Sequence, residues 1–131
     1  MRSWAIGTAC AFVIILVSVD DAQAFRSRNG LEVNPISDTV FEVVDNGRTF
    51  GPGYWCAAAD YARRALRMPW LATLYVHRGL GWAETANRRP SVQFSSEGSG
   101  KGIVSLGVPS TGDAMSVQRA NTMCLNWEPL N

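Results

Sequence analysis

Alternating hydrophobic and polar positions predict two strands early in the chain, over residues 31–36 and 39–45. The second contains the run Thr-Val-Phe-Glu-Val-Val, and strands favour such β-branched and aromatic residues. The Asp-Asn-Gly sequence at 45–47 is typical of a turn that closes a hairpin. Residues 48–50 would then form a short return arm. The polar stretch 25–30 before these strands predicts a frayed terminus.

A helical period replaces the alternation over Tyr54–Arg67, a stretch that contains neither Gly nor Pro. Small and apolar residues fall on one side of this helix: Trp55, Ala58, Ala59, Ala62, Ala65 and Leu66. The other side carries Asp60, Arg63, Arg64 and Arg67. We interpret this charged side as a solvated helix face, with an anion-binding site as the alternative. Pro69 restricts the residue before it, so the helix is expected to end near Arg67.

The second half of the chain predicts further strands over residues 70–78, 91–95 and 103–108, with an extended segment over 114–117. Ser116 is a plausible N-cap for a short final helix that runs through Cys124. In the strand 70–78, alternation places Leu74 and Val76 on one face and Tyr75 and His77 on the other. Short turns between neighbouring strands favour antiparallel pairing. The expected fold class is therefore α+β, a small antiparallel sheet of four or five strands with one main helix packed on one face and a short C-terminal helix.

The first 24 residues match the pattern of a secretory signal peptide. Met1-Arg2-Ser3 is a short positive start, an apolar run follows over Trp4–Val19, and an A-x-A sequence ends at Ala24. The apolar run is short for a membrane span of about 20 residues, so cleavage after Ala24 is preferred over an uncleaved anchor. Residues 25–131 would then form a single small domain in the periplasm or outside the cell.

Cleavage leaves two cysteines, Cys56 and Cys124, in a compartment that permits disulfides. An even cysteine count in an exported chain predicts that they pair. Under the chain-entropy model, a crosslink that closes such a long loop contributes about 4 kcal/mol to the free energy of unfolding.

A cysteine hydrolase is the enzymatic alternative, with Cys56 as nucleophile near a helix N-terminus and His77, the only histidine, on the next strand. Cys124 competes for the same thiol, and His77 would point away from the face that the helix covers. Nothing in the sequence orients the imidazole as a triad requires. We therefore expect no catalytic residues, no metal site and no cofactor. One histidine and scattered acidic residues do not supply a set of metal ligands.

Charge is nearly balanced in the expected exported chain. The full sequence has 12 basic and 11 acidic residues, and removing Arg2, Asp20 and Asp21 with the leader leaves 11 and 9. A net charge of about +2 predicts no nucleic-acid partner. No later apolar run is long enough to span a membrane after cleavage.

A partner surface is expected on the strand face opposite the helix and on the loop after it. The candidate binding residues are aromatic, imidazole and guanidinium side chains, the types enriched at binding hot spots: Tyr75, His77, Trp82, Arg88 and Arg89. The alternative is that Trp82 folds back onto the edge of the sheet and that the arginine pair is a solvated turn.

Three segments carry a resemblance: Tyr-Trp-Cys-Ala-Ala-Ala-Asp-Tyr-Ala at 54–62, Leu-Tyr-Val-His-Arg-Gly-Leu-Gly at 74–81, and Ser-Val-Gln-Arg-Ala-Asn at 116–121 before Cys124. In these segments the chain resembles small uncharacterised secreted two-cysteine proteins of Gram-negative bacteria. The resemblance implies export and a two-cysteine domain of this size, and it implies no activity. The expected function is therefore a non-catalytic secreted or periplasmic module that binds a protein or a cell-envelope component. An inhibitor of exported enzymes would have the same sequence features.

Overall fold

A computed structural model describes residues 24–100, 102 and 107–126. The elements run in the order β1 (Phe25–Arg26), β2 (Glu32–Pro35), β3 (Val40–Val44), α1 (Gly51–Arg64), β4 (Thr73–Trp82), β5 (Pro90–Ser95), β6 (Ala114–Ser116), α2 (Val117–Thr122) and a 3-10 helix (Met123–Asn126). The strands form one antiparallel sheet in the order β1-β2-β3-β5-β4-β6. The predicted α+β class with a main and a short C-terminal helix is confirmed. The sheet has six strands rather than four or five.

The additional strand is β1, in the segment that was expected to fray. Phe25 pairs with Val33 of β2, and its ring meets Tyr61 of α1 edge to face with centroids 5.1 Å apart. The sequence Phe-Arg-Ser-Arg-Asn-Gly looks polar because five of its six residues are polar or glycine. Its single aromatic residue, Phe25, is the one that anchors it. Packing of that ring offsets the entropy of ordering the terminus.

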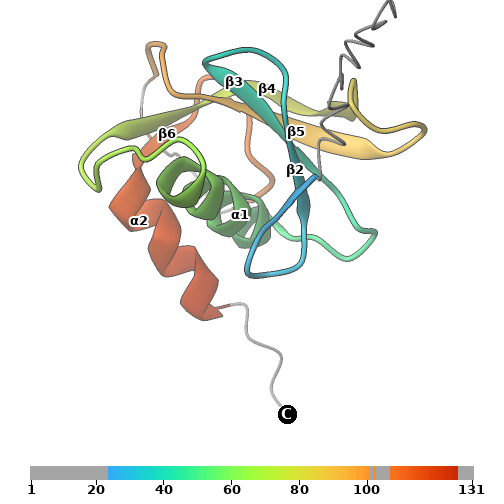
Figure 1. The fold of residues 1–131 in the computed structure, drawn as a ribbon, viewed down its shortest axis with the longest axis horizontal. Helices are drawn as coiled ribbons and strands as arrows, with labels where there is room; N and C mark the ends of the chain where they lie inside the picture. Colours follow the sequence, from blue (N-terminus) through green and yellow to red (C-terminus); the bar gives the residue numbers. More distant parts are fainter. Residues whose placement is uncertain (1–23, 101, 103–106, 127–131) are drawn as a thin grey trace, which may run out of the picture.

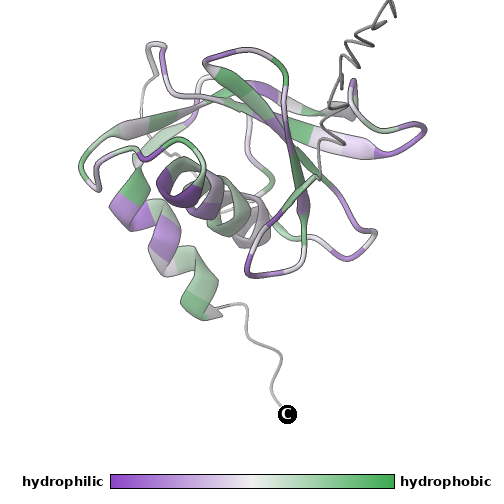
Figure 2. Cartoon of the chain, in the orientation of Figure 1, coloured by the Kyte–Doolittle hydropathy of each residue, from purple (hydrophilic) through white to green (hydrophobic). Residues whose placement is uncertain are grey.

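The core lies between one face of the sheet and α1, which crosses beneath the strands in Figure 1. Phe41 and Phe94 are paired across β3 and β5, and Phe94 meets Trp55 of α1 with ring centroids 5.1 Å apart. The alanines of α1 are buried, which lets the helix lie close to the sheet as its pattern predicted. Figure 2 shows hydrophobic residues recurring along the strands. α2 packs beside α1.

The helix α1 begins three residues earlier than predicted and ends three residues earlier. Gly51-Pro52-Gly53 forms its first turn rather than a separate turn, because proline is tolerated where the backbone N–H has no helical partner. At the other end Arg67 has a φ of 55° and lies outside the helix. Cys56 therefore lies in the second turn, away from the N-terminal end where the helix dipole would lower a thiol pKa.

The prediction that β4 ends at the glycines after Arg78 is wrong, since the strand continues to Trp82. The strand accommodates them through register shifts between Val76 and Arg78 and between Arg78 and Gly81. Packing explains why residue 81 is a glycine, because a Cβ there would lie only 2.4 Å from Nη1 of Arg78. The Asp-Asn-Gly turn at 45–47 also does not close a hairpin, because β3 pairs with β2 and β5 and the turn leads into α1.

The C-terminal elements agree with the sequence pattern. Ser116 caps α2 by accepting a hydrogen bond from the Arg119 backbone N–H at 3.1 Å, and the segment before it forms β6. The α-helix ends at Thr122, and the 3-10 helix continues past Cys124. The strand predicted over 103–108 falls largely outside the described residues.

Candidate functional site

The face of the sheet opposite α1 is polar, and a buried glutamate lies at its centre. Glu42 stands between Phe41 and Val43, whose side chains point to the core, so its own side chain points to the other face. It is 0% exposed, and its direct partner across β5 is Gln93, which is also buried. A buried carboxylate is costly unless it is paired and hydrogen-bonded, so its partners decide its role.

Hydrogen bonds from three sides satisfy the Glu42 carboxylate. Oε1 accepts from the Ser91 hydroxyl at 2.6 Å and from the Glu84 backbone N–H at 3.0 Å. Oε2 accepts from the Thr85 backbone N–H at 2.8 Å and from the Thr85 hydroxyl. Arg78 adds an ion pair, with Nη2 3.4 Å from Oε1. The donors come from β5, from β4 and from the loop after β4, so one side chain ties these parts together.

This environment keeps Glu42 ionised. Burial raises the pKa of Glu42, but hydrogen bonds from Ser91, Thr85 and the Glu84 backbone outweigh burial and hold the pKa below its ordinary value. A general acid would need the opposite shift and a free oxygen facing a substrate. Glu42 has neither, and we interpret it as an anchor.

Arg78 is equally committed to the protein. Its guanidinium donates to the carbonyl oxygens of Gly79 at 2.7 Å and Ser91 at 3.0 Å. It also donates to the Trp82 carbonyl at 3.2 Å and the Ser91 hydroxyl at 2.7 Å. These contacts orient the end of β4 and leave the guanidinium occupied.

The loop 83–89 between β4 and β5 is held at its base and its middle. The Ala83 N–H donates to the Arg89 carbonyl at 2.8 Å, and Arg89 Nη2 donates to the Asp45 carbonyl at 2.9 Å. Asn34 Nδ2 on β2 donates to the Thr85 hydroxyl oxygen at 2.9 Å. Together with the Glu42 bonds, these contacts fix the shape of the loop through the protein's own groups.

This loop, with Trp82 at its start, surrounds a surface hollow of about 520 Å³ lined by residues 82–88. Trp82 is 74% exposed, so its indole does not fold back onto the sheet. Arg88 has a φ of 57°, an uncommon conformation for a residue other than glycine, which costs about 1 kcal/mol. Strain of this kind is often found at binding sites.

Of the predicted binding residues, the structure brings Trp82 and Arg88 together at this hollow. Arg89 is adjacent in sequence, but its guanidinium donates to the Asp45 carbonyl and lies 4.0 Å from a Glu32 carboxylate oxygen. It therefore supports the loop. The sequence pattern could not separate the two arginines, because their roles depend on which strand lies beside each.

Tyr75 and His77 lie elsewhere on β4. Tyr75 pairs with Ser95 whereas Trp82 pairs with Pro90, five residues apart on β5 or roughly 17 Å at 3.4 Å per residue. The Tyr75 ring is partly buried under residues 98–100, and a Cβ on Gly98 would lie 3.2 Å from its Cγ. His77 is exposed at the first register shift. The expected patch of five residues is thus not one continuous site.

Sequence reasoning missed Glu42 as the residue that organises the site. A signal was present: a single carboxylate inside a run of β-branched and aromatic residues is costly unless its strand face supplies partners. The donors Thr85 and Ser91 are far along the chain, and only the order β3-β5-β4 brings them to Glu42.

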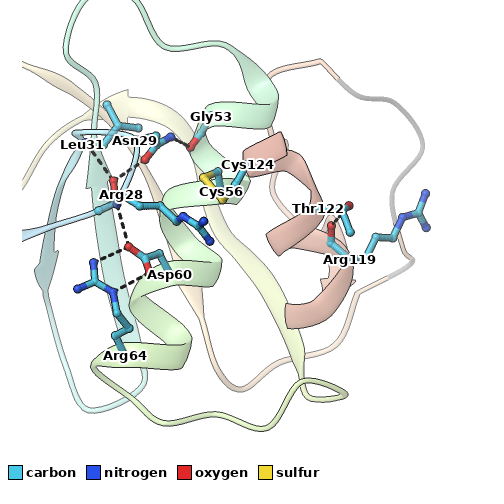
Figure 3. The surroundings of a disulfide bond; sticks show 11 residues. Arg28, Asn29, Leu31, Gly53, Cys56, Asp60, Arg64, Arg119, Thr122 and Cys124 are labelled. Atoms are coloured by element: carbon cyan, nitrogen blue, oxygen red, sulfur yellow. Dashed lines mark hydrogen bonds and ion pairs between the residues drawn. A yellow bond between two sulfur atoms is a disulfide. The ribbon is translucent and has the colours of Figure 1, made fainter. Parts of the chain in front are cut away.

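The predicted disulfide is present. Cys56 of α1 and Cys124 of the 3-10 helix are bonded, with Cα atoms 4.8 Å apart, and Figure 3 shows the bond between the two helical segments. Both cysteines are buried. Cys56 has no free thiol in this structure, so the proposed pair with His77 has no nucleophile here.

A second carboxylate near the disulfide also has several partners. Asp60 of α1 accepts from Arg64 Nη2 at 2.6 Å and Nε at 2.7 Å, and from the Arg28 backbone N–H at 2.8 Å (Figure 3). Burial raises the pKa of Asp60, but the Arg64 and Arg28 contacts outweigh it and lower the pKa. The helix face that was interpreted as solvated therefore also holds the N-terminal turn against α1.

Acid is expected to destabilise the fold through these two carboxylates. Both have folded pKa values below their ordinary values of 3.8 for Asp60 and 4.5 for Glu42. Their contribution is therefore complete above the unfolded pKa values and is lost as the pH falls through the folded ones. Urea titrations between pH 7 and pH 3 should give a free energy of unfolding that is flat near neutrality and falls below about pH 4. A flat curve down to pH 3 would contradict this, and Asp60→Asn should remove part of the slope.

Within the described part of the chain, no three histidine, cysteine, aspartate or glutamate side chains are grouped so that they could hold a metal ion. The described helices include none with the length and apolar character needed to cross a membrane. A scan of known protein families, a search of curated proteins and a search of solved structures return no match to this chain.

Proposed function

We propose that this chain is an exported, non-catalytic module that binds a protein or a component of the cell envelope through Trp82 and the loop 83–89. The observation that carries the proposal is an exposed tryptophan beside a loop that a buried carboxylate holds in place. Aromatic and arginine side chains dominate the energetics of many binding surfaces. Loops supported by a rigid sheet commonly carry function.

Rigidity of the loop supports binding over a purely structural role. Ordering a loop at the moment of binding reduces affinity, and a loop already fixed avoids that cost. Here the Glu84 and Thr85 backbone groups are fixed by Glu42, while the Trp82 side chain stays exposed. Buried hydrogen bonds therefore hold a segment on which the Glu84, Asn87 and Arg88 side chains are exposed.

Export is supported by the leader pattern over residues 1–24 and by the disulfide. Disulfides persist in the periplasm and outside the cell and are rare in reducing compartments. The Cys56–Cys124 bond also favours a non-catalytic role, because a bonded sulfur cannot attack a substrate. We therefore propose a periplasmic or secreted location.

Replacing Trp82 with alanine is expected to abolish retention of the partner while leaving stability unchanged within about 0.5 kcal/mol, because the indole is 74% exposed. The experiment immobilises chains that begin at residue 25 and passes solubilised envelope fraction and secreted protein over them. Phe50→Ala is the matched control, since Phe50 is an aromatic residue 67% exposed at the start of α1.

Material retained by the wild-type chain and by Phe50→Ala, and lost with Trp82→Ala, supports the proposal. Equal retention by the wild type, Phe50→Ala and Trp82→Ala would show that the partner binds at another surface. A loss of several kcal/mol of stability in Trp82→Ala would make the residue part of the core and remove the site.

A further inference from the structure

We infer that the ligand of the Trp82 loop is a glycan chain, an inference that rests on the proposed binding function and names the ligand class. Trp82 would stack on the face of a sugar ring, and the polar side chains around it would bind the hydroxyl groups.

Trp82 presents an exposed aromatic ring on which no described ring or cationic side chain packs. Trp55 is buried against Phe94, and Trp70 lies under the Arg63 guanidinium, 4.1 Å from its ring centroid. The Trp82 ring has neither an aromatic nor a cationic partner within the described residues, and it is 74% exposed. The face of an indole is electron-rich, and it attracts the weakly positive C–H groups that cover one face of many sugar rings.

The side chains beside Trp82 match hydroxyl groups. Glu84, Asn87 and Arg88 line the same hollow and are exposed, and none has a side-chain hydrogen bond or ion pair to another described residue. The Glu84 carboxylate accepts hydrogen bonds, the Asn87 amide both donates and accepts them, and the Arg88 guanidinium donates several. Each sugar hydroxyl is both a donor and an acceptor, so it can use such a mixed set.

The charge of the hollow disfavours other extended ligands. Glu84 and Arg88 carry opposite charges at one site, whereas a phosphate backbone or an anionic membrane surface is attracted by a field of one positive sign. Apart from Trp82, the rest of the lining consists of Ala83, Thr85, Ala86 and Asn87. A protein hot spot usually has a wider apolar core around its aromatic anchor.

A second hollow adjoins the first, so the surface could accommodate an extended ligand. This second hollow shares Thr85 with the first and is lined by Glu32, Asn34 and Pro35 of β2. Ala24 also lines it in the full sequence and would be removed with the proposed leader. Because both hollows are lined by Thr85, their lining extends from Trp82 across the loop to β2. A linear polymer fits such a shallow, open surface, while a small ligand is usually enclosed in a deeper cavity.

The test is co-sedimentation of chains that begin at residue 25 with insoluble peptidoglycan, chitin and cellulose, and with anionic phospholipid vesicles. We expect retention on at least one polysaccharide, competed by soluble oligosaccharides of that polymer. Trp82→Ala should weaken binding at least tenfold, as for a hot-spot anchor, and Asn87→Ala several-fold. Trp70→Ala and Phe50→Ala should bind as the wild type does.

The outcomes separate this inference from the proposed function. Retention on a polysaccharide that depends on Trp82 supports both. Failure on every polysaccharide, with a Trp82-dependent and protease-sensitive partner captured from the envelope fraction, overturns the glycan and leaves the binding module in place. Retention on vesicles alone also overturns the glycan. Binding to polysaccharide that is unaffected by Trp82→Ala overturns this site.

Discussion

Replacing Cys56 or Cys124 with alanine is expected to lower the free energy of unfolding by about 4 kcal/mol, a large share of the total for a domain of this size. The bond joins residues separated by 68 positions, so its loss releases a long loop in the unfolded chain. It also frees the 3-10 helix from α1, and these two segments share part of the core. Urea unfolding of the wild-type and variant chains under non-reducing conditions measures the difference.

The two single variants and the double variant should be destabilised by similar amounts, because each removes the same crosslink. Alanine avoids a buried hydroxyl at either site, which matters because both sulfurs are buried. If the single variants do not fold, reduction of the wild-type chain by dithiothreitol gives the same comparison. A reduced chain as stable as the oxidised one, or strongly unequal single variants, would show that the crosslink does not support the fold.

The disulfide was predictable because the prediction depends only on the number of cysteines in the expected exported chain. With the proposed leader set aside, two cysteines remain, and we expect an exported chain with two cysteines to pair them. The strands β3 and β5 and the body of α1 were predictable for a related reason, since their local pattern agrees with the face that each one buries.

The errors occur where tertiary contacts overrule a local signal. Gly79 and Gly81 predict the end of a strand, but β4 continues through them because Gly81 leaves room for the Arg78 side chain. The segment 25–30 predicts a frayed terminus, but Phe25 packs on Tyr61 and holds β1 in place. The Phe25 ring needs a partner distant in sequence, and the Gly81 effect depends on where strand pairing directs the Arg78 side chain. A local pattern reveals neither.

The candidate site was predictable only in part. Trp82 and Arg88 were selected by residue type, and they do lie at one hollow. Tyr75 was selected because it shares a strand face, but residues 98–100 cover its ring. The carboxylate that holds the loop, Glu42, was not selected, because its partners come from three separate elements.

Removing the Glu42 carboxylate is expected to cost about 3 kcal/mol of stability and to loosen the binding loop. Glu42→Ala leaves Arg78 without its counter-ion and leaves the buried Ser91 hydroxyl and Gln93 amide without their acceptor. Breaking a buried pair costs about 3–5 kcal/mol, and the partial exposure of Arg78 places this case at the lower end. Glu42→Gln keeps the volume but turns an NH₂ group toward backbone donors, so it should also be destabilised.

Glu32→Gln is the matched control. Glu32 lies on the neighbouring strand, is partly exposed, and contacts Asn34 at 3.0 Å and Arg89 at 4.0 Å. Because solvent can replace these contacts, its substitution should change stability by no more than about 0.5 kcal/mol. Comparing Glu42→Gln with Glu32→Gln separates the effect on stability of losing a buried, hydrogen-bonded carboxylate from the effect of losing a negative charge.

Amide hydrogen exchange shows whether the loop depends on Glu42. The Glu84 and Thr85 N–H groups donate to the Glu42 carboxylate, so Glu42→Gln should speed exchange at these two positions more than at the β3 and β5 amides that pair within the sheet. The same variant should weaken Trp82-dependent binding although it leaves Trp82 in place. The loosened loop would lose conformational entropy when it binds, and this loss reduces affinity. Unchanged exchange at Glu84 and Thr85, with stability within 0.5 kcal/mol of the wild type, would show that the loop holds its shape without the carboxylate.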